Sequence, residues 1–144
     1  MRVTVQLSEG LAAGERRLIR AARLAPLLRS SGAVLGVEGS LTVRLVMDPA
    51  IADLNERFRS VAGPTDVLAF PSGENGYVGD VAISVESACR QSLRPVEELR
   101  LLAVHGLLHC LGYDHVEASE AREMTVRTRQ LLPDQDVPDL VPVS

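Results

Sequence analysis

Residues 95–115 read PVEELRLLAVHGLLHCLGYDH, and this stretch predicts a long helix that ends in a tight turn. Leucine and other apolar residues recur along it at spacings of three and four, which is the pattern of a helix packed against a core. Pro95 suits the first helical turn, and Gly112 favours a stop just after the last apolar position. We therefore expect a largely buried helix over residues 95–111.

Outward from this helix, hydrophobic periodicity predicts four strands and about five helices. Strands are expected at residues 3–7, 41–47, 67–70 and 77–85. Helices are expected at residues 12–30, from residue 49 to about residue 59, and at residues 86–92, 95–111 and 117–132. Gly63-Pro64 breaks the chain before the third strand, Pro71 is expected to end that strand, and residues 72–76 read as a turn.

Proline and aspartate refine the first two helices. Pro26 is expected to kink or divide the helix over residues 12–30. Asp48 can cap the next helix, which starts at Pro49 and is expected to turn Leu54 and Phe58 inward. A chain of 144 residues is long enough for one core, so we predict a single α/β (α+β) domain.

Composition and charge narrow the functional classes. The formal net charge of −4 argues against a protein that coats nucleic acid nonspecifically, although it leaves room for a local basic groove. No apolar run approaches the roughly 18 residues that span a bilayer, and the N-terminus lacks the apolar core of a signal peptide. We expect a cytoplasmic protein with no membrane partner, whose Cys89 and Cys110 are buried thiols.

The three histidines of the chain all lie in one short segment, as His105, His109 and His115. Positions four apart lie on one face of a helix, so His105 and His109 can converge on one ion. Gly112 lets the chain turn back and bring His115 to the same place. Three imidazoles leave one coordination position open for water, as in catalytic zinc sites, so we predict one zinc ion and a hydrolytic reaction. Other divalent transition metals would suit the same ligands.

Two alternatives bear on this interpretation. An isolated pair of histidines on an apolar helix is often structural, and the third histidine after a glycine is what favours a metal. The spacing is similar to that of metzincin proteases, but those carry Glu directly after the first histidine, where this chain has Gly106. A zinc peptidase is therefore the weaker alternative, because the residue that activates water is missing.

The segment HGLLHCLGYDH at residues 105–115 resembles the signature of the YbeY family of bacterial metal-dependent endoribonucleases, HGxLHxxGYDH. The resemblance covers about residues 54–124. It extends to Leu54-Asn55 with Arg59, to residues 64–71 (PTDVLAFP), to Gly79-Asp80-Val81, and to Glu120-Ala121 with Met124. Ala69 stands where the family commonly has Ser, a change that leaves the histidines intact.

This resemblance implies a small mixed four-stranded sheet packed with helices and zinc on the three histidines. It also implies cleavage of single-stranded RNA in ribosomal RNA maturation and ribosome quality control, with ribosomal RNA or ribosomal particles as partners. The resemblance also implies that Arg59 lies in the substrate groove, where a guanidinium can pair with phosphate. We therefore expect residues 1–132 to form one metallohydrolase domain. Residues 133–144 are expected to form a tail that is rich in Asp and Pro and has few residues able to form a packed structure.

Some assignments stay open at the level of sequence. Asp66, Asp80 and Asp114 are candidates for the carboxylates that orient metal-bound imidazoles, although Asp in a turn more often bonds its own backbone. Tyr113 can stack or pack, and the general base is not identified. The main rival to an endoribonuclease is a noncatalytic ribosome-assembly factor in which the metal only holds the helix and loop together.

Overall fold

The computed structural model describes residues 1–142 and divides them into four strands and six helices. In chain order these are β1 (Arg2–Leu7), α1 (Ala13–Ala22), α2 (Leu24–Leu35), β2 (Ser40–Val46), α3 (Asp48–Arg59), β3 (Val67–Glu74), β4 (Tyr77–Ser84), α4 (Val85–Gln91), α5 (Pro95–Cys110) and α6 (Ala118–Leu131). The predicted α+β fold and the long helix through the histidines are confirmed. Among residues 1–142, no helix combines the length and apolar character needed to cross a bilayer.

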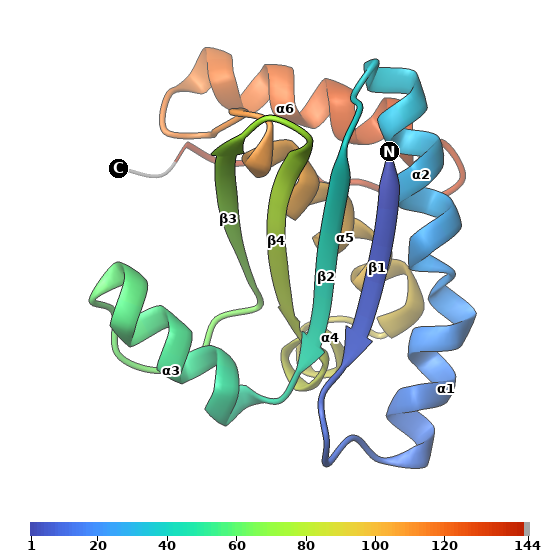
Figure 1. Ribbon diagram of the computed structural model, residues 1–144, viewed down its shortest axis with the longest axis vertical. Helices are drawn as coiled ribbons and strands as arrows, with labels where there is room; N and C mark the ends of the chain where they lie inside the picture. Colours follow the sequence, from blue (N-terminus) through green and yellow to red (C-terminus); the bar gives the residue numbers. More distant parts are fainter. Residues whose placement is uncertain (143–144) are drawn as a thin grey trace.

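The sheet is mixed, as predicted, with the strand order β1-β2-β4-β3 (Figure 1). Strand β2 pairs in parallel with both β1 and β4, and β3 pairs antiparallel with β4 through a tight turn at Asn75-Gly76. Gly76 has a φ of 83°, a left-handed conformation that glycine adopts readily in tight turns. This order leaves β3 as an edge strand.

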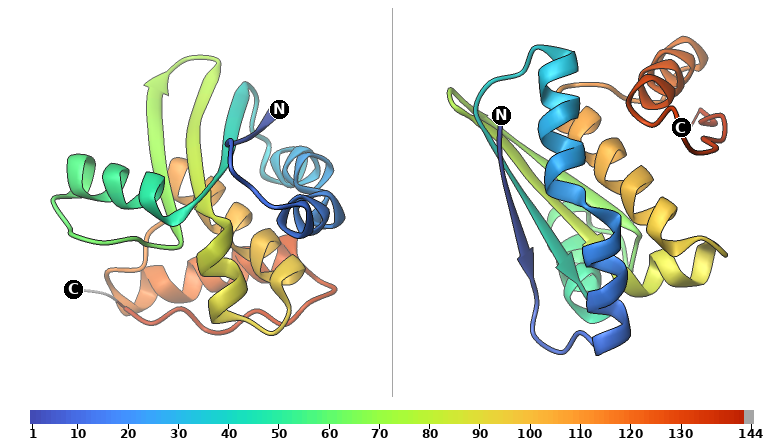
Figure 2. Two further views of the ribbon diagram at one scale, coloured as in Figure 1. Left: turned by 90° about the horizontal axis from the view of Figure 1, so that it is seen from below. Right: turned by 90° about the vertical axis from the view of Figure 1, so that its right-hand side faces the viewer.

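Helices cover the two faces of the sheet unequally. Figure 2 shows α1, α2 and α5 on one face, with α6 outside α5. Alternate residues of the central strands, among them Val43, Val81 and Ile83, are fully buried there against Leu99 and Leu107 of α5. Helix α3 packs on the opposite face, where a smaller cluster consists of Val46, Ile51, Leu68 and Ala82 with Leu54 and Phe70 packed against it.

Two glycines let α5 lie directly on the sheet. A Cβ atom added at Gly106 would overlap a methyl group of Val81 on β4. A Cβ atom added at Gly79 would lie 2.9 Å from Cys110 Sγ on α5. Because neither position has room for a side chain, the histidine-bearing end of α5 is fixed closely against β4.

The helix predicted over residues 12–30 is two helices, and it divides earlier than expected. The break lies at Arg23, whose φ of 48° is left-handed, while Pro26 lies in the first turn of α2. A proline is tolerated there because the N–H it lacks has no partner within the helix. The expectation that Pro26 would divide the helix is therefore confirmed, with the break three residues before the proline, and this division raises the number of helices to six.

Helix α3 differs from its prediction in its cap and its inward face. Met47 is the N-cap, and the Asp48 carboxylate instead accepts hydrogen bonds from Ser84, Ser87 and Arg90. These bonds tie the start of α3 to α4. Phe58 is 61% exposed, so its predicted inward position is wrong; its ring packs edge-on against Phe70 with the centroids 5.3 Å apart.

Three further expectations need correction. Strand β3 continues through Pro71 to Glu74, which an edge strand allows because its outer N–H groups need no partner. The turn is accordingly shorter than residues 72–76. Cys89 is exposed rather than buried, because it lies near the end of the short surface helix α4, and Cys110 is partly buried.

Residues 133–142, here called the C-terminal segment, have no helix or strand but pack against the domain. Val137 is buried, and its carbonyl accepts a hydrogen bond of 2.8 Å from Arg129 Nη2 on α6. The Leu140 N–H donates to Thr125 Oγ1 at 3.0 Å. The segment thus has more to pack with than its composition suggests; residues 143–144 of the predicted tail lie outside the described residues.

Candidate metal centre

The structure brings His105, His109 and His115 together. One ring nitrogen from each lies within 4.8 Å of the others, and the Nε2 atoms of His105 and His109 are 3.0 Å apart. The ring centroids of His115 lie 5.5 Å and 5.3 Å from those of His105 and His109. The convergence expected from the spacing is therefore present in the folded chain.

The turn after α5 returns His115 to the helix. Gly112 has a φ of 98°, a left-handed conformation that favours glycine. The N–H of Gly112 donates to His109 O at 3.0 Å, and the N–H of Tyr113 donates to Leu108 O at 3.0 Å. These bonds satisfy the last carbonyls of the helix and reverse the chain within a few residues.

The environment keeps the imidazoles of His105 and His109 neutral. Burial, followed by the neighbouring His109 and His115, lowers the pKa of His105 to about 4. Burial also lowers the pKa of His109, with a further contribution from His115. Neutral imidazoles have the free lone pairs that a metal ion needs, so at neutral pH no proton has to be displaced from these two rings.

The donor set suits a single metal ion. In a tetrahedral site with metal–nitrogen distances of about 2.0–2.1 Å, ligand nitrogens lie roughly 3.3 Å apart, close to the spacing seen here. Nδ1 of His115 is buried and has no hydrogen-bond partner among residues 1–142. A buried nitrogen without a partner is costly, and coordination of a metal would satisfy it. The three histidines can therefore hold a metal ion.

The histidines face a groove of about 770 Å³ that Arg59 also lines. The groove follows β3 from Val67 to Pro71 and includes Leu140 of the C-terminal segment. Arg59 is the last residue of α3, and the loop that follows is held by a hydrogen bond of 3.0 Å from Asn55 Nδ2 to Gly63 O. Among the described residues Arg59 forms no ion pair, so its guanidinium is free to bind an anionic ligand.

The proposed aspartate partners of the histidines bond to other groups. Asp114 accepts from the N–H of His115 at 2.8 Å, and Asp66 accepts from the N–H of Val67 at 2.8 Å, as aspartates in turns commonly do. Asp80 lies 3.9 Å from Arg44. Within residues 1–142, none of the three accepts a hydrogen bond from an imidazole.

The structure adds residues to the site that sequence reasoning missed. Leu140 reaches the groove from the C-terminal segment, and Gln91 and Glu98 lie in a cavity next to His105. The apolar residues Val137 and Leu140 within a polar tail were the available signal for the first. Glu98 lies seven residues before His105 on the same face of α5, so helical spacing was the signal for it, whereas only tertiary packing brings Gln91 of α4 beside them. Tyr113 packs against an apolar cluster between α5 and α6 that includes Leu108 and Met124, and its hydroxyl accepts a hydrogen bond from Arg127.

Fold and site together define a small α+β protein that presents three imidazoles and one arginine to a common groove. Residues 19–135 match the family model described as Endoribonuclease YbeY. The chain is 38% identical to the Endoribonuclease YbeY of Thermobifida fusca, over 92% of either chain. It is 35% identical to that of Chloroflexus aurantiacus, over 90% of this chain and 92% of the relative.

A solved structure agrees with the family match. The solution structure of a protein from Thermotoga maritima is 27% identical and superposes with a TM-score of 0.57, covering 90% of this chain and 86% of that one. The chain belongs to the YbeY family.

Proposed function

We propose that this protein is a zinc-dependent endoribonuclease that cuts single-stranded RNA in the maturation of ribosomal RNA and in ribosome quality control. It acts in the cytoplasm, with ribosomal RNA or ribosomal particles as its partners. The observation that carries the proposal is the groove that joins three convergent imidazoles with Arg59, in a chain of the YbeY family.

His105, His109 and His115 would hold the metal, and we propose zinc because three imidazoles with an open position are typical of catalytic zinc sites. When bound, the metal supplies Lewis acidity that polarises a phosphodiester and acidifies water. Arg59 would bind the phosphate and stabilise the negative charge that develops on its oxygens. Attack by the 2′-hydroxyl group leaves a cyclic phosphate and attack by water does not, so product end groups distinguish the two routes.

The structure also bears on the peptidase alternative. Gly106 occupies the position that carries the catalytic Glu in metzincins, and its Cα packs against Val81. A side chain there would push α5 away from β4, so this fold has no room for that general base. The remaining rival is a noncatalytic assembly factor, in which the same metal only stabilises the turn after α5.

The test is cleavage of single-stranded RNA by protein of measured metal content, beside His109→Ala protein prepared in the same way. We expect the metal-loaded parent to cut and the variant to lose both bound metal and cleavage, because one of three ligands is missing. Identical preparation controls for contaminating nuclease.

Ribosomal particles serve as a second substrate. Since the net charge of −4 gives little general attraction for RNA, we expect faster cleavage on particles than on naked RNA. If the metal-loaded parent is inert on both substrates, the assembly factor replaces the endoribonuclease. Cleavage by His109→Ala protein at the parental rate would remove the metal from the mechanism.

A further inference from the structure

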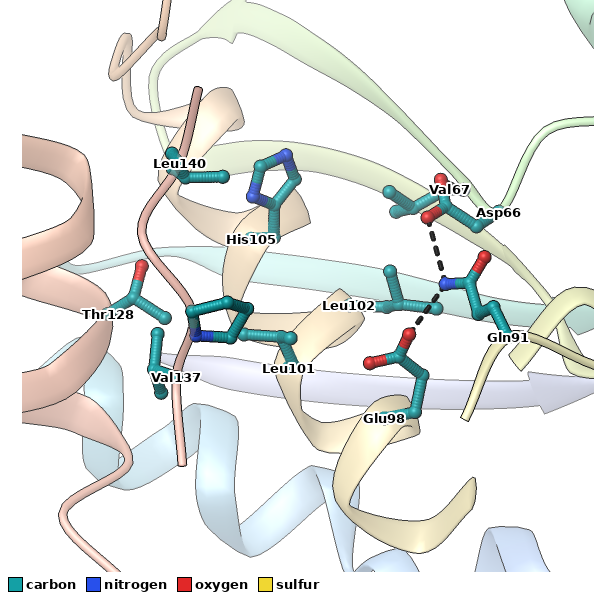
Figure 3. A pocket seen from close by; sticks show the side chains of 11 residues that line it. Asp66, Val67, Gln91, Glu98, Leu101, Leu102, His105, Thr128, Val137 and Leu140 are labelled. Carbon is teal, nitrogen blue, oxygen red and sulfur yellow. Dashed lines mark hydrogen bonds between the residues drawn. The ribbon is translucent and has the colours of Figure 1, made fainter. Parts of the chain in front are cut away.

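A separate cavity of about 160 Å³ opens beside the histidines (Figure 3). Asp66, Val67, His105 and Leu140 line both this cavity and the groove, so the two spaces are neighbours that share a wall. The cavity extends from this wall toward the start of α5, where Glu98 lies. If a ligand lies in the groove, a neighbouring part of the same ligand can therefore reach into this cavity.

The walls of the cavity are mainly apolar. Leu101 and Leu102 of α5, Val67 of β3, and Val137 and Leu140 of the C-terminal segment line it. The hydrogen bonds from Arg129 to Val137 O and from Leu140 N to Thr125 hold the C-terminal segment in place. An apolar lining with a few polar groups suits the ring of a small ligand.

The end of the cavity at Glu98 is polar, and the donors of Gln91 and Thr128 are already used. Gln91 Nε2 donates to Asp66 Oδ2 at 3.1 Å and to Glu98 Oε2 at 2.6 Å, which uses both amide hydrogens. The Thr128 hydroxyl donates to Met124 O at 2.7 Å. The polar groups that remain at this end, Glu98 Oε1 and Gln91 Oε1, are acceptors, while His105 lines the opposite end beside the groove. The end at Glu98 therefore favours a ligand that presents N–H groups.

Size and polarity together specify the ligand. An apolar cavity of about 150 Å³ holds a benzene ring, so a cavity of about 160 Å³ matches a single ring better than a purine. Single-stranded RNA presents its bases unstacked and open to recognition at their edges. The amino group of cytosine donates to a carboxylate, whereas uracil would place a carbonyl oxygen there.

We propose that this cavity binds a cytosine base of the RNA, in the nucleotide next to the phosphodiester that occupies the groove. The base would lie against the apolar residues that line the cavity and donate its amino group to Glu98. This inference rests on the proposed function for the identity of the ligand, but it concerns binding and does not require cleavage. It makes Glu98 a determinant of sequence specificity.

The test compares short oligocytidylate with oligouridylate by fluorescence anisotropy. Binding is measured in a His109→Ala background, because the parent is expected to cut RNA and His109 does not line the cavity. We expect oligocytidylate to bind about tenfold more tightly. Glu98→Gln should remove this preference, because its amide can donate to uracil, without weakening the binding of oligouridylate.

Glu97→Gln is the matched control. It makes the same change of charge one residue earlier on α5, but Glu97 pairs with Arg94 at 3.5 Å and does not line the cavity. The preference for cytosine should persist in this variant. The comparison of the two RNAs needs no change at residue 98, so the proposal can be tested even if Glu98→Gln unfolds.

Mapping of cleavage sites in the metal-loaded parent separates the two proposals. Cleavage with equal binding of both RNAs would overturn the cytosine pocket and leave the endoribonuclease intact. A preference for cytosine in a protein that never cuts RNA would support the cytosine pocket and overturn the endoribonuclease. If instead a basic peptide binds in a manner that Glu98→Gln abolishes, and no preference between RNAs is found, the cavity accepts a protein side chain and the proposal is wrong.

Discussion

At the scale of single residues, two arginines of α3 show how position decides what a charge does. Arg57 pairs with Asp53 at 3.4 Å, and its guanidinium lies 5.6 Å from the centre of the Phe58 ring. Arg59, two residues further, lines the groove and pairs with no described carboxylate. Only the second guanidinium faces the place where a phosphate would bind.

We expect Arg59→Gln to slow RNA cleavage by about 10- to 100-fold, because a charge-assisted hydrogen bond contributes roughly 1.5–3 kcal/mol. It should also make the slope of log RNA affinity against log salt concentration shallower, by the contribution of about one phosphate contact. Arg57→Gln is the control and should change cleavage by less than about twofold. Equal losses in both variants would indicate a general effect of charge and would remove Arg59 from the mechanism.

The three histidines could be predicted from the sequence because their convergence depends on local geometry. Four residues of helix separate the first two, and a glycine turn returns the third. The exposure of Phe58 and the grouping of Gln91 with Glu98 could not be predicted, since both depend on which elements pack side by side. Local pattern thus predicts the convergence of the three histidines and leaves the rest of the groove undefined.

At the scale of elements, α5 serves the core and the site at once. Leu99 and Leu107 are fully buried in the main cluster, while His105 and His109 face the groove from the same helix. The close contact of Gly106 with Val81 sets how near the helix lies to β4. Anything that moves α5 outward therefore moves two proposed ligands with it.

Gly106→Ala should destabilise the protein by about 1–3 kcal/mol, because the added methyl group overlaps Val81 in a packed interior. Metal affinity should fall as well. The control is Gly14→Ala in α1, where the nearest atom to an added Cβ is 3.7 Å away. That change should stabilise by about 0.5–1 kcal/mol, as alanine favours a helix.

Urea unfolding measures both stabilities, and a Gly106→Ala, Val81→Ala double variant tests the cause. If the overlap is responsible, the double variant should be more stable than the sum of the two single changes allows. Strict additivity would show that the two positions do not interact.

The elements themselves were largely predictable, and the failures share a physical origin. Strand alternation and helical periodicity located the sheet and α5, because one face of each is buried in the core. A break near Pro26 was expected from the sequence, but its position at Arg23 was not predictable, since a left-handed arginine has no local signature. The same holds for the Asp48 carboxylate, which bonds to α4 rather than capping its own helix.

At the scale of the whole molecule, the site makes stability depend on pH. In metal-free protein the pKa of His105 is lowered from 6.5 to about 4, so the unfolded chain binds a proton that the folded chain excludes. This difference in bound protons is absent well above pH 6.5, the ordinary pKa of His105. The stability that it removes from the folded state grows as the pH falls from 6.5 toward 4. The folded state is therefore weakened over this range.

We expect metal-free protein to lose up to about 3 kcal/mol of stability relative to His105→Gln protein between these limits, at about 1.4 kcal/mol for each unit of pKa. Urea unfolding as a function of pH measures the difference, and subtracting the variant cancels the other titrating groups. Asp48 affects stability in a different pH range. Because its pKa is lowered in the folded protein, the stability that it contributes is lost only as the pH falls below its ordinary pKa of 3.8. Parallel pH profiles for the two proteins would contradict the burial of a neutral His105.

Strand β3 has a further consequence because it is an edge of the sheet and also a wall of the groove. An edge strand exposes backbone groups that can pair with a strand of another molecule, which is a common start of aggregation. Pro71 already removes one donor from this edge. A ligand in the groove would therefore lie along the same strip of backbone with which a second molecule could pair, so we expect RNA binding to slow any self-association of metal-free protein.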